Sequence, residues 1–126
     1  MKRVCIIGHF GHGENLLNGQ TVKTKIVTKE IVKELGKKEV SCIDTHGGVK
    51  ALISAFRHAL IALKYHKNII IMPAENGLRI FAPLLVLLNL LFHRKLHYVV
   101  IGGWLPEFLK KRKKLTKALM SFDGIY

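Results

Sequence analysis

The sequence predicts an α/β fold with a Rossmann-like parallel sheet and helices on both faces. Short apolar runs of strand length alternate with segments of helical periodicity, and glycine-containing polar loops separate them. Alternation of this kind forms βαβ units with parallel strands and right-handed crossovers. At 126 residues and 49% hydrophobic content, the chain is large enough for one domain with a real core, covering residues 1–126.

The first half of the chain contains two strands, each followed by a helix. Residues 3–8 (RVCIIG) form a continuous apolar run, which is typical of a strand buried on both faces. Residues 21–35 carry apolar side chains close to helical spacing, and Gly36 ends that helix. Residues 39–44 form the second strand, and residues 50–65 form an amphipathic helix.

The second half continues the alternation. Pro73 closes the third strand, and Pro106 begins a basic helix at a position where a missing N–H costs little. The expected elements are a strand at 68–72, a loop at 73–77, an apolar helix at 78–92, a strand at 97–102, a helix at 106–120 and the opening of a fifth strand at 122–126.

The two cysteines, Cys5 and Cys42, both fall in predicted strands and lack the spacing of a metal site. We expect buried free thiols, which suit a reducing cytoplasm. The apolar run near the N-terminus is too short for the core of a signal peptide. The sequence therefore predicts a cytoplasmic protein.

The charge balance points to a phosphate-bearing partner. Lys and Arg number 21 against 8 Asp and Glu, which gives a formal net charge of +13. Such a field attracts nucleic acid, anionic lipid headgroups or a diphosphate-bearing substrate. Aromatic residues do not interleave with the basic ones as they do in single-strand binders, so nucleic acid is the least favoured of these partners.

Ligands of parallel sheets bind beyond the carboxyl ends of the strands, at the point where the strand order reverses. Four predicted loops follow strands there, and their polar or small residues are the candidate binding residues. Each also has a structural interpretation, as a tight connection, a surface histidine, a helix cap or a packed aromatic ring. The candidates are Gly11, His12, Asn18, Gly19, Gln20, His46, Glu75, Asn76, Gly102, Gly103 and Trp104.

The first loop does not carry the dinucleotide fingerprint. Its glycines, Gly8, Gly11 and Gly13, are spaced G-x-x-G-x-G, whereas dinucleotide binding needs G-x-G-x-x-G. A D-x-D metal motif is absent from the sequence, because its only aspartates are Asp44 and Asp123. We therefore expect no bound cofactor and no metal.

Four segments together carry a resemblance to a known family. They are "RVCIIGHFGHGENLLNGQTVKTK", "CIDTHGG", "IIIMPAENG" and "HYVVIGGWLPEFLKKRKKLTKAL". In this combination the chain resembles the N-terminal, acceptor-side domain of a bacterial GT-B glycosyltransferase of the family 4 type, associated with capsular or other surface polysaccharides. The resemblance covers the whole chain but half of the family's architecture.

The resemblance implies an enzyme that transfers a sugar from a nucleotide-sugar donor to a glycan or lipid-linked acceptor. The donor would bind mainly to a C-terminal domain with an E-x7-E element, which this chain lacks, so a second chain carrying that domain is an expected partner. Gly19 matches a loop glycine that lies near the donor phosphates. Many relatives have a histidine where this chain has Gly102, Gly103 and Trp104, so no catalytic residue is assigned.

The chain stops as its fifth strand begins, which predicts a truncated domain or one half of a two-chain enzyme. Sugar transfer requires both substrates to be held in reactive geometry. We therefore expect the isolated domain to be inactive.

A membrane surface is a further candidate partner. The apolar segment 78–92 has 15 residues, fewer than the roughly 20 that span a bilayer. Beside the basic cluster it suggests docking on anionic lipid at the inner face of the cell membrane. The alternative is a buried helix with solvated lysines. The cluster consists of Lys110, Lys111, Arg112, Lys113 and Lys114.

Two other function classes stay open. A non-catalytic subunit that anchors a separate donor-binding chain to the membrane would explain the size and the basic, apolar surface. A basic nucleic-acid-binding protein would explain the net charge of +13.

Overall fold

A computed structural model describes residues 2–8, 19–44, 52–72, 75–100 and 105–126. Strands and helices alternate along the chain, as the periodicity predicts. The strands are β1 (Lys2–Gly8), β2 (Val40–Asp44), β3 (His66–Met72), β4 (Lys95–Tyr98) and β5 (Gly124–Ile125). The helices are α1 (Gly19–Leu35), the 3₁₀ turn η1 (Lys37–Glu39), α2 (Leu52–Tyr65), α3 (Glu75–Phe92), α4 (Leu105–Lys110) and α5 (Lys113–Met120).

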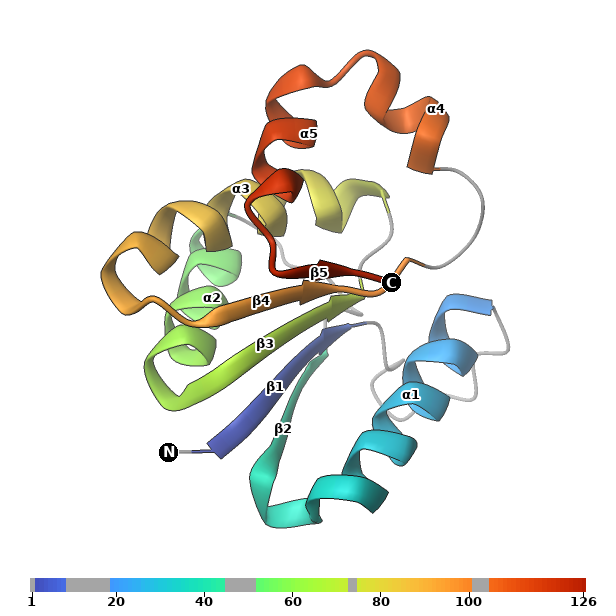
Figure 1. The fold of residues 1–126 in the computed structure, drawn as a ribbon, viewed down its shortest axis with the longest axis vertical. Coiled ribbons are helices and arrows are strands. Elements are labelled where there is room, and N and C mark those ends of the chain that lie inside the picture. Colours follow the sequence, from blue (N-terminus) through green and yellow to red (C-terminus); the bar gives the residue numbers. More distant parts are fainter. Residues whose placement is uncertain (1, 9–18, 45–51, 73–74, 101–104) are drawn as a thin grey trace.

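The five strands form one parallel sheet in the order β2-β1-β3-β4-β5. The chain first moves outward from β1 to β2, then returns past β1 to β3 and continues in the other direction. The strand order therefore reverses between β1 and β3. The predicted fold class, a Rossmann-like α/β sheet flanked by helices, is confirmed (Figure 1).

The helices cover the two faces of the sheet unequally (Figure 1). On one face, α2, α3, α4 and α5 pack on β1, β3 and β4 around a large core that includes Ile7, Phe81 and Tyr98. On the other face, α1 packs on a smaller cluster around Ile6 and Met72. Neighbouring residues of one strand, such as Ile6 and Ile7, enter different cores because strand side chains alternate between faces.

The basic helix expected over 106–120 is two helices. The helical path stops between α4 and α5, where Arg112 has φ −127° and ψ 70°. In one straight helix, the five consecutive cations would include pairs that are three and four residues apart, and like charges at these spacings face each other and repel. At the bend, the Arg112 guanidinium donates a hydrogen bond of 2.9 Å to the carbonyl oxygen of Phe108, near the end of α4. The single-helix prediction is therefore wrong at this joint.

Three further expectations need correction or adjustment. Glu75 and Asn76 belong to the first turn of α3, not to a loop, because the helix begins three residues earlier than its apolar pattern. Cys5 is buried as expected, but Cys42 is exposed, because β2 is the edge strand; both thiols are free. The fourth strand begins at Lys95, two residues earlier than expected.

Gly36 ends α1 as predicted. It has a φ of +92°, a conformation that favours glycine over residues with a side chain. Its N–H donates to the carbonyl oxygen of Val32 at 2.8 Å, which closes the last turn of the helix.

Candidate functional site

The carboxyl ends of the central strands are aligned at one edge of the sheet, which we call the carboxyl edge. Gly8, the last residue of β1, lies opposite Asp44 of β2 and Met72 of β3 in the parallel register. The reversal of strand order between β1 and β3 therefore falls at Gly8 and Met72. In open parallel sheets, this is where a ligand-binding crevice forms.

Gly8 allows α1 to approach the end of β1 closely. A Cβ atom at this position would lie 2.8 Å from Cγ2 of Thr24, closer than Cβ atoms approach other heavy atoms. Thr24 is fully buried and lies in the second turn of α1. The glycine at the end of the first strand thus sets the position of the helix that follows it, and the start of α1 with it.

Lys23 of α1 lies near the carboxyl edge, on the face of the sheet opposite the large core. Its Nζ atom donates a hydrogen bond of 3.1 Å to the carbonyl oxygen of Val100, two residues beyond β4. This contact joins α1 to the segment that follows β4, although the two residues are 77 positions apart. It puts an exposed ammonium group near the carboxyl edge.

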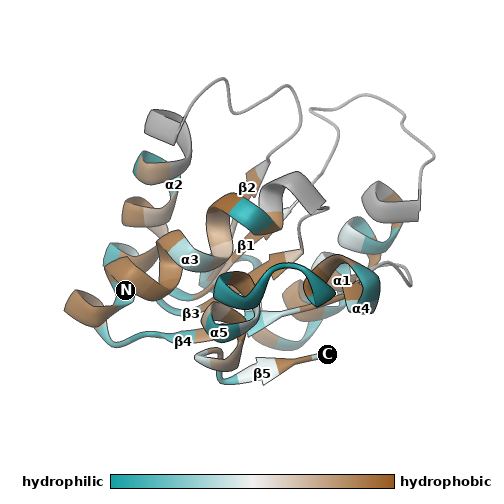
Figure 2. Ribbon diagram, turned by 90° about the horizontal axis from the view of Figure 1, so that it is seen from above, coloured by the Kyte–Doolittle hydropathy of each residue, from teal (hydrophilic) through white to brown (hydrophobic). Residues whose placement is uncertain are grey.

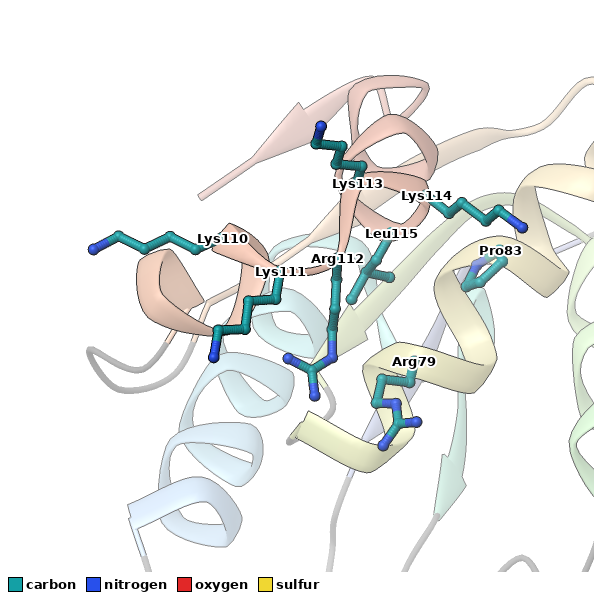
Figure 3. A pocket seen from close by; sticks show the side chains of 8 residues that line it. All are labelled: Arg79, Pro83, Lys110, Lys111, Arg112, Lys113, Lys114 and Leu115. Atoms are coloured by element: carbon teal, nitrogen blue, oxygen red, sulfur yellow. The ribbon is translucent and has the colours of Figure 1, made fainter.

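A second cationic feature lies between α3 and the joint of α4 and α5. A cavity of about 590 Å³ is present here, within the size range of roughly 300–1,000 Å³ typical of small-molecule sites. Figure 3 shows the lining side chains, which are Arg79, Pro83, Lys110, Lys111, Arg112, Lys113, Lys114 and Leu115. None of the described residues that line this cavity is acidic. We call it the cationic pocket.

Arg112 is held in place within this pocket. Its guanidinium carbon lies 4.0 Å from the ring centroid of Phe108, a cation–π contact, and one of its nitrogens bonds the Phe108 carbonyl oxygen. Phe108 belongs to the large core. The position of the Arg112 charge is therefore fixed by packing before any ligand arrives.

Most of the residues predicted from the sequence to bind ligand lie outside the described part of the chain. These are Gly11, His12, Asn18, His46, Gly102, Gly103 and Trp104. Gly19 and Gln20 begin α1, and Glu75 and Asn76 begin α3, so four candidates occupy helix starts; their side chains are not described. Their predicted binding roles stay predictions.

The basic cluster of residues 110–114 lines the cationic pocket together with Arg79, which sequence reasoning did not select as a site residue. Its signal was present, because Arg79 is the only Lys or Arg between residues 75 and 92, in a mostly apolar segment. Lys23 was also missed. Nothing in the local sequence distinguishes it from the other lysines of α1, and its contact with Val100 depends on the tertiary fold.

Within the described ranges, no group of three or more His, Cys, Asp and Glu residues is placed to hold a metal ion. No helix in the described part of the chain combines the length and the apolarity needed to cross a membrane. Comparison with models of protein families and with curated proteins found no match to this sequence.

Proposed function

We propose that this chain is the acceptor-binding half of a glycosyltransferase. It would hold a glycan or lipid-linked acceptor while a sugar is transferred from a nucleotide-sugar donor, in the synthesis of a surface polysaccharide. The donor would be bound mainly by a second domain or chain. Alone, the chain is expected to bind acceptor without transferring sugar.

One observation carries this proposal. The four sequence segments that resemble the glycosyltransferase domain each include the carboxyl end of one strand of β1 to β4 and then run past it. These four strands are adjacent in one parallel sheet, so all four segments leave the sheet at the carboxyl edge. The strand-order reversal at Gly8 and Met72 falls among them, where parallel sheets bind substrates.

The charge distribution near this edge supports a phosphate-bearing acceptor. Lys23 lies near the carboxyl edge, and Arg79 is the fifth residue of α3, the helix that follows β3. Both helices begin near the carboxyl edge, so the positive ends of their dipoles also favour an anion there.

The test is calorimetric titration of the chain with a water-soluble, short-chain prenyl diphosphate that carries a sugar. The matched ligand is the same prenyl diphosphate without the sugar, and a single-stranded oligonucleotide is the third ligand. We expect saturable binding that is at least several-fold tighter for the sugar-bearing compound. Equal affinity with and without the sugar, or a preference for the oligonucleotide, would contradict an acceptor-binding role.

A membrane-anchoring subunit is the second candidate, because apolar side chains are exposed on one side of α3. Leu87, Leu90 and Leu91 have 64%, 67% and 79% of their surface exposed. In Figure 2, α3 is mainly hydrophobic, whereas the joint of α4 and α5 is hydrophilic. An apolar surface near cations is the combination that binds anionic membranes.

Vesicle flotation distinguishes this candidate. Leu90→Glu and Leu91→Glu together should abolish flotation with phosphatidylglycerol vesicles if α3 inserts its apolar side into lipid. The matched control is Ile61→Glu on α2, which is also exposed. Flotation that survives the leucine changes would rule out anchoring through α3.

A further inference from the structure

The cationic pocket concentrates positive charge, and the described residues supply little carboxylate charge to balance it. Its lining includes six Lys and Arg residues from α3, α4, α5 and the joint between them: Arg79, Lys110, Lys111, Arg112, Lys113 and Lys114. Among the described residues, Lys110 is the one lining cation with a carboxylate partner, Glu107, at 2.8 Å. The like charges around this cavity repel one another, so an anion that enters it is stabilised.

Three of the six lining cations extend in a common direction, which favours one anionic group over a diffuse field. Figure 3 shows the guanidinium groups of Arg79 and Arg112 and the ammonium group of Lys111 directed to the same side. Lys110 and Lys113 extend outward. Arg112 is fixed by the Phe108 ring and carbonyl oxygen, so its fork of N–H donors keeps its orientation without a ligand.

The pocket also has apolar walls, which separates it from an exposed run of lysines. Leu115 is 6% exposed and belongs to the large core, and Pro83 of α3 contributes its ring. Pro83 has no N–H, so the carbonyl oxygen of Arg79 receives no helical hydrogen bond from it. The cations therefore lie next to packed apolar residues of the core.

We propose that the cationic pocket is a binding site for a phosphate or diphosphate group, held mainly by Arg79, Lys111 and Arg112. The guanidinium groups of Arg79 on α3 and of Arg112 at the joint can each offer paired N–H donors to phosphate oxygens, and Lys111 adds a third charge. Assigning that phosphate to the sugar acceptor rests on the proposed function. The affinity of the pocket for phosphate is independent of the proposed function.

The test is titration of the whole chain with inorganic pyrophosphate at fixed ionic strength, followed by calorimetry. Arg79→Gln and Lys111→Gln are the principal variants, because both residues are exposed. Each should weaken pyrophosphate binding about tenfold or more. Arg112→Lys keeps the charge but loses the fork, so we expect an intermediate loss, with thermal melting used to check that the joint still folds.

The matched control is Arg57→Gln on α2, which removes the same charge from an exposed position outside the pocket. It should leave pyrophosphate affinity unchanged. If Arg57→Gln weakens binding as much as Arg79→Gln, net charge alone explains the affinity and the site is refuted. Absence of saturable pyrophosphate binding to the unmodified chain would refute it as well.

Further titrations identify the source of the phosphate. Preference for a short-chain prenyl diphosphate over pyrophosphate, lost in Arg79→Gln, supports the site and makes its ligand lipid-linked. Equal affinities, lost in the same variant, support the site with a water-soluble ligand. Tight oligonucleotide binding that Arg79→Gln and Arg57→Gln reduce equally would instead assign the charge to nucleic acid. If pyrophosphate binds in the pocket but the prenyl diphosphate binds equally well with and without its sugar, the phosphate site is supported and the proposed function is contradicted.

Discussion

The two faces of the sheet differ in how much core they carry and in what they support. The face under α2, α3, α4 and α5 buries large side chains such as Phe81 and Tyr98, and the cationic pocket is mounted on it through Phe108 and Leu115. The other face buries Val4, Ile6, Val40 and Met72 under α1. The fixed charge of Arg112 therefore lies on the face with the larger core, which we call the thick face. The face with the smaller core, the thin face, supports α1, which begins near the carboxyl edge.

Adjacent isoleucines of β1 test this difference with the same substitution. Ile6 and Ile7 are both fully buried, but Ile6 belongs to the smaller core on the thin face and Ile7 to the larger core on the thick face. Ile7→Ala should cost about 4 kcal/mol of unfolding free energy, and Ile6→Ala about 2 kcal/mol, because a cavity under fewer neighbours can collapse more fully. Urea unfolding followed by circular dichroism measures both. Equal costs would contradict the distinction between the faces.

The contact between Gly8 and Thr24 tests how closely α1 is fixed to the thin face. Gly8→Ala should cost about 1–3 kcal/mol, because the added Cβ would lie 2.8 Å from Cγ2 of Thr24. Thr24→Ser removes that methyl group. In the Thr24→Ser background the same glycine change should cost clearly less, as thermal and urea unfolding of the four proteins would show. If the losses of unfolding free energy in Gly8→Ala and Thr24→Ser simply add in the double variant, α1 moves freely to accept the Cβ.

Two histidines in strands of the sheet make stability depend on pH. His66 is 4% exposed, and burial lowers its pKa below 6.5, with Lys2 adding to the shift and the Ala62 carbonyl oxygen opposing it. The pKa of His97, in the groove beside α1, is also lowered by burial, but Asp123 opposes that shift. In both cases the unfolded chain binds protons more readily. Stability should therefore decline as pH falls from about 6.5 toward each folded-state pKa.

Replacing each histidine by asparagine identifies its share of this acid sensitivity. Because His66 is the more deeply buried, His66→Asn should flatten the decline between about pH 6.5 and 5 more than His97→Asn does. Urea unfolding across this pH range is the measurement. A steeper decline in His66→Asn would show that the folded state binds that proton more tightly than the unfolded chain.

Lys23 should contribute least to stability. Its hydrogen bond to the Val100 carbonyl oxygen is exposed, so Lys23→Gln should change the unfolding free energy by less than about 0.5 kcal/mol. Thermal melting checks this. A large loss of unfolding free energy would mean that α1 depends on this contact for its position. The variant could not then be used to probe acceptor binding near the carboxyl edge.

The fold could be predicted from the sequence because each element carries its own local signal. Continuous apolar runs marked β1 and β3, and Gly36 marked the end of α1. The joint at Arg112 could not be predicted in this way, because a run of cations and apolar residues from 106 to 120 satisfies helical periodicity throughout. The break depends on charge repulsion and on a side-chain contact to Phe108.

The candidate site was predictable in its position but only partly in its residues. Parallel topology alone predicts a ligand at the carboxyl edge, and the basic cluster at 110–114 is visible in the sequence. The contribution of Arg79 required knowing that α3 packs beside α5, and the place of Lys23 required the contact with Val100. Convergence of residues far apart in sequence is set by tertiary packing, which local patterns do not encode.

The most direct test of the account is to map acceptor binding on the two ends of the sheet by ¹⁵N–¹H spectra. The chain would be titrated with the short-chain prenyl diphosphate sugar. Amides at the carboxyl edge and the pocket, such as Gly8, Lys23 and Arg79, should shift together and saturate. Lys2 and Lys67, at the amino ends of β1 and β3, are also exposed cations and should not. Equal shifts at both ends would show that charge alone attracts the ligand and would contradict the account.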